Sequence, residues 1–176
     1  MNRENVKREW FGAVRSIADS SGKKLKEESA LTPVQAVKLD ILLRQYLCDG
    51  LADLISESEK VSTEEANNLQ KDIYSELIED AIAGVWSETE NMETAMFLFD
   101  CTKGVRTERR FSALLKEILS GADSEGTQAL MTEMDKDITE FSEKRKALRQ
   151  PKKSSSDDEP PPWMDEFEYI DWVMTH

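Results

Sequence analysis

Residues 32–56 read TPVQAVKLDILLRQYLCDGLADLIS, and this stretch decides the fold class. Thr32 is a natural N-cap, Pro33 suits the first helical position, and Gln35 completes a capping box. Apolar residues then recur at helical spacing as far as about Ser56, which predicts one helix over 33–56. They are Val34, Val37, Ile41, Tyr46, Leu47, Leu51, Leu54 and Ile55. Gly50 interrupts this helix at a cost of about 1 kcal/mol relative to alanine, which predicts a kink or a close helix crossing.

The same apolar spacing predicts five further helices, over 3–19, 62–86, 88–102, 107–120 and 124–149. We expect Ser20, Ser21 and Gly22 to end the first of them, followed by a charged connector over 23–29. The residues expected to face inward are Val6, Trp10, Val14, Ile17, Leu69, Ile73, Leu77, Ala81, Ile82, Val85, Trp86, Met92, Met96, Phe99, Phe111, Leu114, Leu115, Ile118, Leu119, Leu130, Met134, Ile138, Phe141 and Leu148.

The composition supports an all-α fold. The chain has only seven glycines, and helix-forming residues dominate over β-branched ones. Its hydrophobic content of 39% and charged content of 34% fit a modest core with a disordered extension. We therefore predict a bundle of about six helices over 1–149, a flexible linker rich in Lys, Ser and Pro over 150–162, and an acidic aromatic docking peptide over 163–176.

The net charge of −13 makes direct binding to nucleic acid unexpected, because phosphate recognition requires clustered cations. Most of that charge lies in residues 45–101, which carry 14 acidic and 2 basic side chains. No apolar run approaches the roughly 18–20 residues of a membrane span, and the chain opens on polar residues. We expect a soluble intracellular protein, cytoplasmic or nuclear, with reduced thiols.

Histidine chemistry is nearly excluded, because the single histidine is His176. A Ser-His-Asp triad and a histidine-ligated metal site both need internal histidines. The chain also lacks a glycine-rich phosphate-binding loop. Cys48 and Cys101 lie among apolar helical positions, which is typical of buried small hydrophobic residues. We therefore predict no catalytic residue, no metal and no cofactor.

Paired carboxylates are the one remaining catalytic resource. Glu76-x-x-Glu79 resembles the first half of the magnesium motif of all-helical nucleotide pyrophosphohydrolases. The second half is missing, since Phe97 stands three residues before Asp100. We interpret these carboxylates as a solvated helix face, and a magnesium-dependent carboxylate hydrolase is the least favoured alternative.

The C-terminal peptide carries large apolar side chains among acids, and it cannot bury them by itself. Trp163, Phe167, Ile170 and Met174 are spaced four, three and four, which predicts one face of a helix that orders only on contact. We also count Met164, Tyr169 and Trp172 among the partner-binding residues.

Two short-motif resemblances fit this peptide. The spacing of Trp163, Phe167 and Ile170 resembles that of groove-binding acidic activation peptides. As an added strand, residues 167–170 instead resemble the aromatic-x-x-aliphatic motif that ubiquitin-like autophagy modifiers bind. A third alternative is that the peptide folds back on its own bundle as a seventh helix.

A basic strip precedes the peptide, formed by Lys144, Arg145, Lys146, Arg149, Lys152 and Lys153. It resembles a nuclear localisation signal, although cations at a helix C-terminus also complement the helix dipole. Ser154, Ser155 and Ser156, followed by three acids, resemble sites of an acidophilic kinase. A second basic cluster, at Lys103, Arg106, Arg109 and Arg110, is explained by pairing with the acidic helices over 33–56 and 62–86.

The first functional hypothesis is a non-enzymatic adaptor or regulatory protein whose bundle binds one protein and whose C-terminal peptide binds another. The acidic peptide favours a partner with a basic-rimmed apolar groove. The alternative is an acidic viral or phage antagonist that occupies a nucleic-acid-binding surface. The sequence indicates no oligomeric state.

Overall fold

The capping box predicted at Thr32 forms, and it starts the central helix, α2 (Pro33–Cys48). In the computed structural model of the protein, which describes residues 2–120 and 124–150, the Thr32 hydroxyl accepts a hydrogen bond from the Gln35 amide at 3.2 Å. The Gln35 side chain accepts the Thr32 amide at 2.9 Å. Two backbone donors at the helix start are satisfied in this way, with Pro33 in the first turn.

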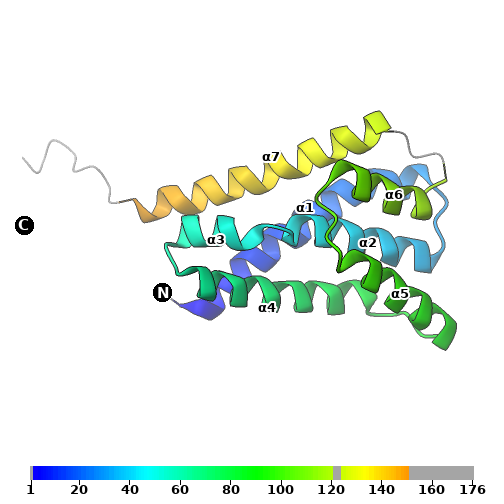
Figure 1. Ribbon diagram of the computed structural model, residues 1–176, viewed down its shortest axis with the longest axis horizontal. Coiled ribbons are helices and arrows are strands. Elements are labelled where there is room, and N and C mark those ends of the chain that lie inside the picture. The colour runs from blue at the N-terminus through cyan, green and yellow to red at the C-terminus, as the bar shows by residue number, and fades with distance from the viewer. Residues whose placement is uncertain (1, 121–123, 151–176) are drawn as a thin grey trace, which may run out of the picture.

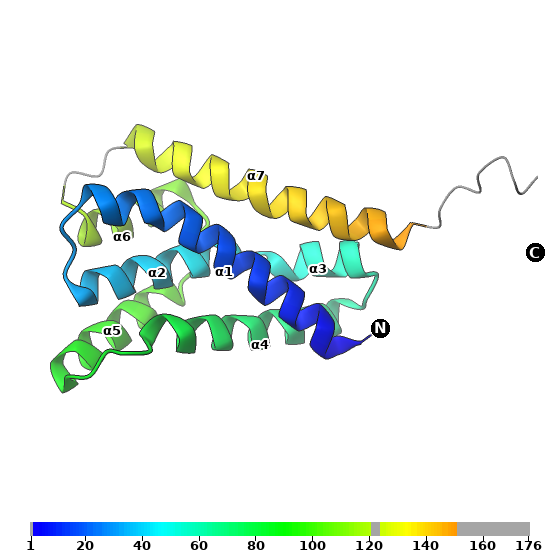
Figure 2. The same cartoon turned by 180° about the vertical axis from the view of Figure 1, so that it is seen from behind.

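The predicted all-α class is confirmed, since the described residues contain seven helices and no strand. The other six are α1 (Arg3–Glu28), α3 (Leu51–Glu59), α4 (Thr63–Ile82), α5 (Glu88–Cys101), α6 (Glu108–Ile118) and α7 (Ser124–Arg149). In Figures 1 and 2, α7 runs along one side of the bundle and α4 along the other, with α2 and α3 between them and α1 crossing one face. The chain start and the end of α7 lie at one end of the bundle, and α5 lies at the other.

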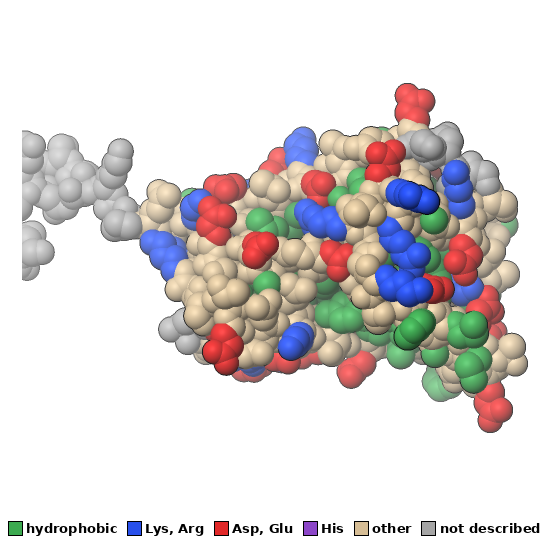
Figure 3. Space-filling view, in the orientation of Figure 1, with side chains coloured by type: hydrophobic (Ala, Val, Ile, Leu, Met, Phe, Trp, Pro, Cys, Tyr) green, Lys and Arg blue, Asp and Glu red, His purple; other side chains and the backbone are tan. Residues whose placement is uncertain are grey.

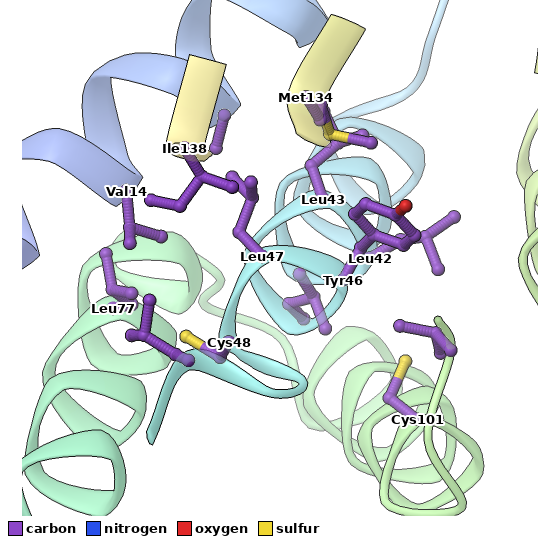
Figure 4. Close-up of a cluster of buried hydrophobic side chains, with 14 of the residues drawn as sticks. Val14, Leu42, Leu43, Tyr46, Leu47, Cys48, Leu77, Cys101, Met134 and Ile138 are labelled. Carbon is purple, nitrogen blue, oxygen red and sulfur yellow. The ribbon is translucent and has the colours of Figure 1, made fainter. Parts of the chain in front are cut away.

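Almost every residue in the second half of α2 is buried. From Leu39 to Cys48 only Asp40 is not fully enclosed. Figure 4 shows side chains of four other helices around it: Val14 from α1, Leu77 from α4, Cys101 from α5, and Met134 and Ile138 from α7. A helix that is buried all round needs neighbours on every side, so α2 organises the bundle.

The helix predicted over 33–56 breaks into α2 and α3. Gly50 adopts a left-handed conformation with φ of +80° and separates the two segments. Asp49 fixes the break, because its Oδ2 accepts the backbone amide of Val105 at 2.6 Å. Gly50 was thus correctly identified as an irregular position, but it ends a helix instead of bending one. This break raises the count from about six helices to seven.

The predicted end of the first helix at residues 20–22 is wrong, because α1 continues to Glu28. Ser21 and Gly22 are buried, and a Cβ atom placed on Gly22 would lie 3.1 Å from Leu43 Cδ1. The small side chains therefore permit close contact between α1 and α2. Lys26, expected in a connector, instead lies in α1 and contacts Asp40 of α2 at 2.6 Å.

The predicted inward face of α5 is also wrong. Met92, Met96 and Phe99 are 64, 65 and 67% exposed, and the buried residues are Thr94, Phe97 and Cys101. α5 carries apolar residues on two opposite faces, and periodicity alone does not show which face packs. Two further positions expected inside are exposed: Trp86, which follows the end of α4 at Ile82, and Leu148 near the end of α7.

Two more findings complete the fold. Among the described residues, no helix is both long and apolar enough for a membrane crossing. The predicted linker, apart from Gln150, and the predicted docking peptide lie outside the described residues.

The conformation of Gly50 leads to a prediction with an internal control. Gly50→Ala should destabilise the protein by about 1–2 kcal/mol, because a side chain disfavours left-handed backbone even where space is open. Gly12→Ala, at an exposed position inside α1 that is equally open, should stabilise it by about 0.5–1 kcal/mol. Urea unfolding followed by circular dichroism measures both changes, and effects of the same sign would contradict the assigned conformation.

Candidate functional site

The structure describes four residues of the basic strip, and three of them, Arg145, Lys146 and Arg149, pair with acids of α3. Lys144, Arg145, Lys146 and Arg149 lie in the last turns of α7. Lys146 pairs with Glu57 at 2.5 Å, with both side chains at the surface. Lys152, Lys153, Ser154, Ser155, Ser156 and all seven residues of the aromatic peptide lie outside the described residues.

Glu59, the last residue of α3, is the buried partner of this strip. Its side chain is fully enclosed. One carboxylate oxygen accepts hydrogen bonds from Arg145 Nε at 2.8 Å and from Trp10 Nε1 at 3.0 Å. The other oxygen contacts the Arg149 guanidinium. This one carboxylate thereby links α1, α3 and α7. Glu59 is also the structural partner of Arg145 and Arg149, two of the six residues of the basic strip, and their local sequence does not reveal it.

The pKa of Glu59 lies below its ordinary value. Burial alone would raise this pKa, but hydrogen bonds from Arg145 and Trp10 and the charges of Arg145 and Arg149 outweigh that effect. The carboxylate is therefore ionised at neutral pH. The end of α7 is therefore held to the bundle by ion pairs that are lost only when acid protonates Glu59.

The acidic face of α4 is largely paired with cations of α1. Arg3 contacts Glu65 at 3.0 Å and Asp72 at 2.5 Å, and Lys7 contacts Glu76 at 2.7 Å. Further along, Arg15 lies 3.3 Å from Asp80. Glu76, one half of the pyrophosphohydrolase-like pair, therefore has a protein cation as its partner. No group of three or more potential metal ligands forms in the described part of the chain.

These pairs also bear on the hypothesis of an acidic antagonist. Arg44 of α2, only 3% exposed, adds a further cation 3.2 Å from Asp80. Imitation of a nucleic-acid backbone depends on a row of free negative charges. Four cations from α1 and α2 instead occupy the row on α4, so we do not carry this alternative forward.

The second basic cluster contacts one of the two expected segments, residues 33–56, and also contacts α5 and α7. Arg106 donates to the Asp49 carbonyl at 2.8 Å and to Asp135 of α7 at 2.9 Å. Arg110 donates to the Asp100 carbonyl at 2.6 Å. These bonds hold the connector between α5 and α6 against the core. Arg106 and Arg110 thus have structural roles.

Both cysteines are buried, as their apolar surroundings predict. Burial raises the pKa of each thiol to about 12. At neutral pH neither thiol provides the thiolate that nucleophilic or metal-binding cysteines need.

A cavity of about 490 Å³ lies between α1, α6 and α7. Leu25, Leu115, Leu119 and Leu130 form its apolar part, and Lys24, Glu28 and Glu133 form its rim. Its lining contains no histidine, cysteine or Gly-rich loop, so it has the character of a packing groove.

The surface feature that sequence reasoning missed is the outer face of α5. Figure 3 shows hydrophobic side chains gathered over α5 at the lower right of the molecule. Met92, Met96 and Phe99 of α5 are exposed large hydrophobic residues, and the 88% exposed Trp86 precedes the helix. The sequence of α5 has two apolar stripes at helical spacing. A helix too short to be enclosed on both sides leaves one of two such stripes exposed. The second stripe is therefore the signal that could have identified this face.

No protein-family model, no curated protein and no solved structure matches this chain.

The Glu59 cluster generates a pH-dependent prediction. Glu59→Gln should lower stability at pH 7 by about 1–3 kcal/mol, because it leaves two arginines beside an enclosed neutral amide. Since the folded-state pKa of Glu59 is lowered, its contribution is fully present above the ordinary value of 4.5 and is lost as the pH falls through the folded value. The difference between wild type and variant should therefore shrink in acid.

Urea unfolding at several pH values between 7 and 3 provides the measurement. Glu57→Gln is the matched control, since it removes a surface carboxylate paired with the same helix and should change stability little. A constant difference across the pH range, or a Glu59→Gln variant as stable as wild type, would show that the cluster does not fasten α7.

Proposed function

We propose that the protein is a non-enzymatic adaptor whose C-terminal peptide binds a partner protein while the helical bundle presents it. The partner would offer an apolar groove with a basic rim. Trp163, Phe167, Ile170 and Met174 would enter the groove, and the neighbouring acids would face its rim.

The observation that supports this proposal most is the way α7 ends. Arg145 and Arg149 hold its last turns to Glu59, so the described part of the chain ends at a fixed point at one end of the molecule (Figure 1). The 12 residues between Gln150 and Trp163 give the peptide a reach of about 45 Å at full extension. A tethered peptide of this reach can meet a partner beyond the surface of the bundle.

The core of the described residues is the second support. All seven helices contribute buried apolar side chains to it, and large residues such as Trp10, Tyr46 and Phe111 are fully buried there. Under the proposal the peptide's aromatic residues bind a partner and add nothing to this core.

The expected affinity follows from the side chains involved. Burial of four large apolar groups contributes on the order of 6–10 kcal/mol before costs. Ordering the peptide opposes binding by about 2–5 kcal/mol, and loss of translational freedom opposes it further. The dissociation constant is therefore expected to be micromolar or weaker, which suits a reversible regulatory contact.

The test compares the full chain with the full-length double variant Trp163→Ala, Phe167→Ala. We expect the variant to lose at least one protein that the immobilised wild type retains from a cell extract, while its melting temperature stays unchanged. Val173→Ala, which truncates an apolar residue of the same segment that is not among the partner-binding residues, is the matched control and should retain that protein.

Two outcomes would contradict the adaptor proposal. One is an identical set of retained proteins for wild type and double variant. The other is a melting temperature lowered by many degrees, which would place the peptide in the fold.

A further inference from the structure

One face of α5 carries an ordered series of exposed side chains. Glu88, Met92, Met96, Phe99 and Lys103 follow one another at spacings of four, four, three and four. On a helix with 3.6 residues per turn they fall within an arc of about 80°, and we call them the α5 strip. The three apolar members are about two-thirds exposed. Lys103 lies just past the helix end, with Nζ 5.7 Å from the centre of the Phe99 ring, so it belongs to the same surface.

The opposite face of α5 explains why the strip points outward. Phe97 and Cys101 are buried, and Lys38 of α2 pairs with Glu93 at 2.5 Å. α5 is thereby fixed on α2 in one orientation. Its second apolar face has no neighbour among the described residues, and exposed apolar area of this kind is typical of a binding surface.

The chain's own C-terminal peptide is poorly placed to cover the strip. α7 is about 39 Å long, and its end lies at the opposite end of the bundle from α5 (Figures 1 and 2). The linker reaches about 45 Å only when fully stretched. Docking within one molecule would therefore demand an almost taut linker, which conformational entropy opposes.

The order of charges along the strip is self-complementary. An acid, Glu88, stands at one end, and a base, Lys103, stands at the other. Met96 lies at the middle, between Met92 and Phe99. If a second α5 packs antiparallel on the first, Glu88 of each copy meets Lys103 of the other, and Met96 packs on its own counterpart. The helix dipoles are also antiparallel in this arrangement. Parallel packing would instead place like charges together at both ends.

We propose that the α5 strip is a homodimer interface, in which α5 helices of two copies pack antiparallel about a two-fold axis near Met96. Such an interface uses one patch twice, as two-fold symmetry requires. The apolar residues provide the affinity, and the two Glu88–Lys103 pairs provide the orientation. The strip is short, and a net charge of −13 on each copy opposes association, so the dimer is weak and reversible. It goes beyond the adaptor function, because a dimer would present two C-terminal peptides.

Sedimentation equilibrium of the full chain is the first test. The weight-average mass should rise with concentration from the 20.1 kDa of one chain towards twice that value. Met96→Asp with Phe99→Asp should abolish the rise and leave the melting temperature unchanged, since both side chains are exposed. Leu148→Asp is the matched control: it places a charge on an equally exposed leucine of α7 and should leave the dimer intact.

Charge reversal tests the antiparallel orientation. Glu88→Lys alone and Lys103→Glu alone should each weaken self-association at least severalfold, because each variant carries like charges at both ends of the strip. A mixture of the two variants should form a heterodimer with restored opposite pairs. Melting temperatures confirm that both variants fold.

Four results would overturn the proposal. They are a wild-type chain that stays monomeric up to several hundred micromolar, a dimer unaffected by the strip variants, a charge-reversed mixture that fails to associate, and a dimer lost in the Trp163→Ala, Phe167→Ala variant. The last result would identify the C-terminal peptide as the occupant of the strip. The first three results do not bear on whether the peptide binds a partner protein, so failure of this proposal and failure of the adaptor proposal are distinguishable.

Discussion

The burial of α2 on all sides is the constraint on which the rest of the structure depends. Its residues from Ile41 to Cys48 are all enclosed, so every flank of the helix must be covered by another element. This requirement accounts for the close approach of α1 at Gly22 and for the packing of one face of α5 through Phe97. It also requires buried polar groups to find partners: Arg44 reaches Asp80, and the Tyr46 hydroxyl donates to Asp135 at 2.9 Å.

Charge in this protein is arranged to join helices, and this limits what the surface can do. The acids of α4 pair with α1. Glu59, at the end of α3, pairs with Arg145 near the end of α7. Asp49 holds the connector after α5. These carboxylates are therefore engaged by the fold. The two proposed recognition surfaces, the α5 strip and the aromatic peptide in the sequence beyond α7, combine apolar residues with charged ones. Under both proposals these surfaces bind protein chains.

Local signals predicted helix starts well and helix neighbours poorly. Thr32 was identified as an N-cap because a cap needs only the next three residues, and it accepts the expected amide of Gln35. The predicted helix starts at residues 62, 88 and 107 agree with those of α4, α5 and α6 to within one residue. Gly22 was misread as a helix end because its role depends on Leu43 of another helix. The inward face of α5 was misassigned because two apolar stripes have the same period. The partner of the basic strip, Glu59, is distant in sequence, so no local pattern could reveal it. The docking peptide stays a prediction.

The central claim is that the bundle is complete around α2 and that the C-terminal aromatic residues are free for another protein. Amide hydrogen exchange on the monomeric full chain tests both parts in one measurement. The account predicts that amides of residues 41–48 exchange only through global unfolding, whereas those of 163–174 exchange at the rate of an unstructured chain. Slow exchange in 163–174, or local opening of α2 at a lower free energy than that of the surrounding helices, would contradict it.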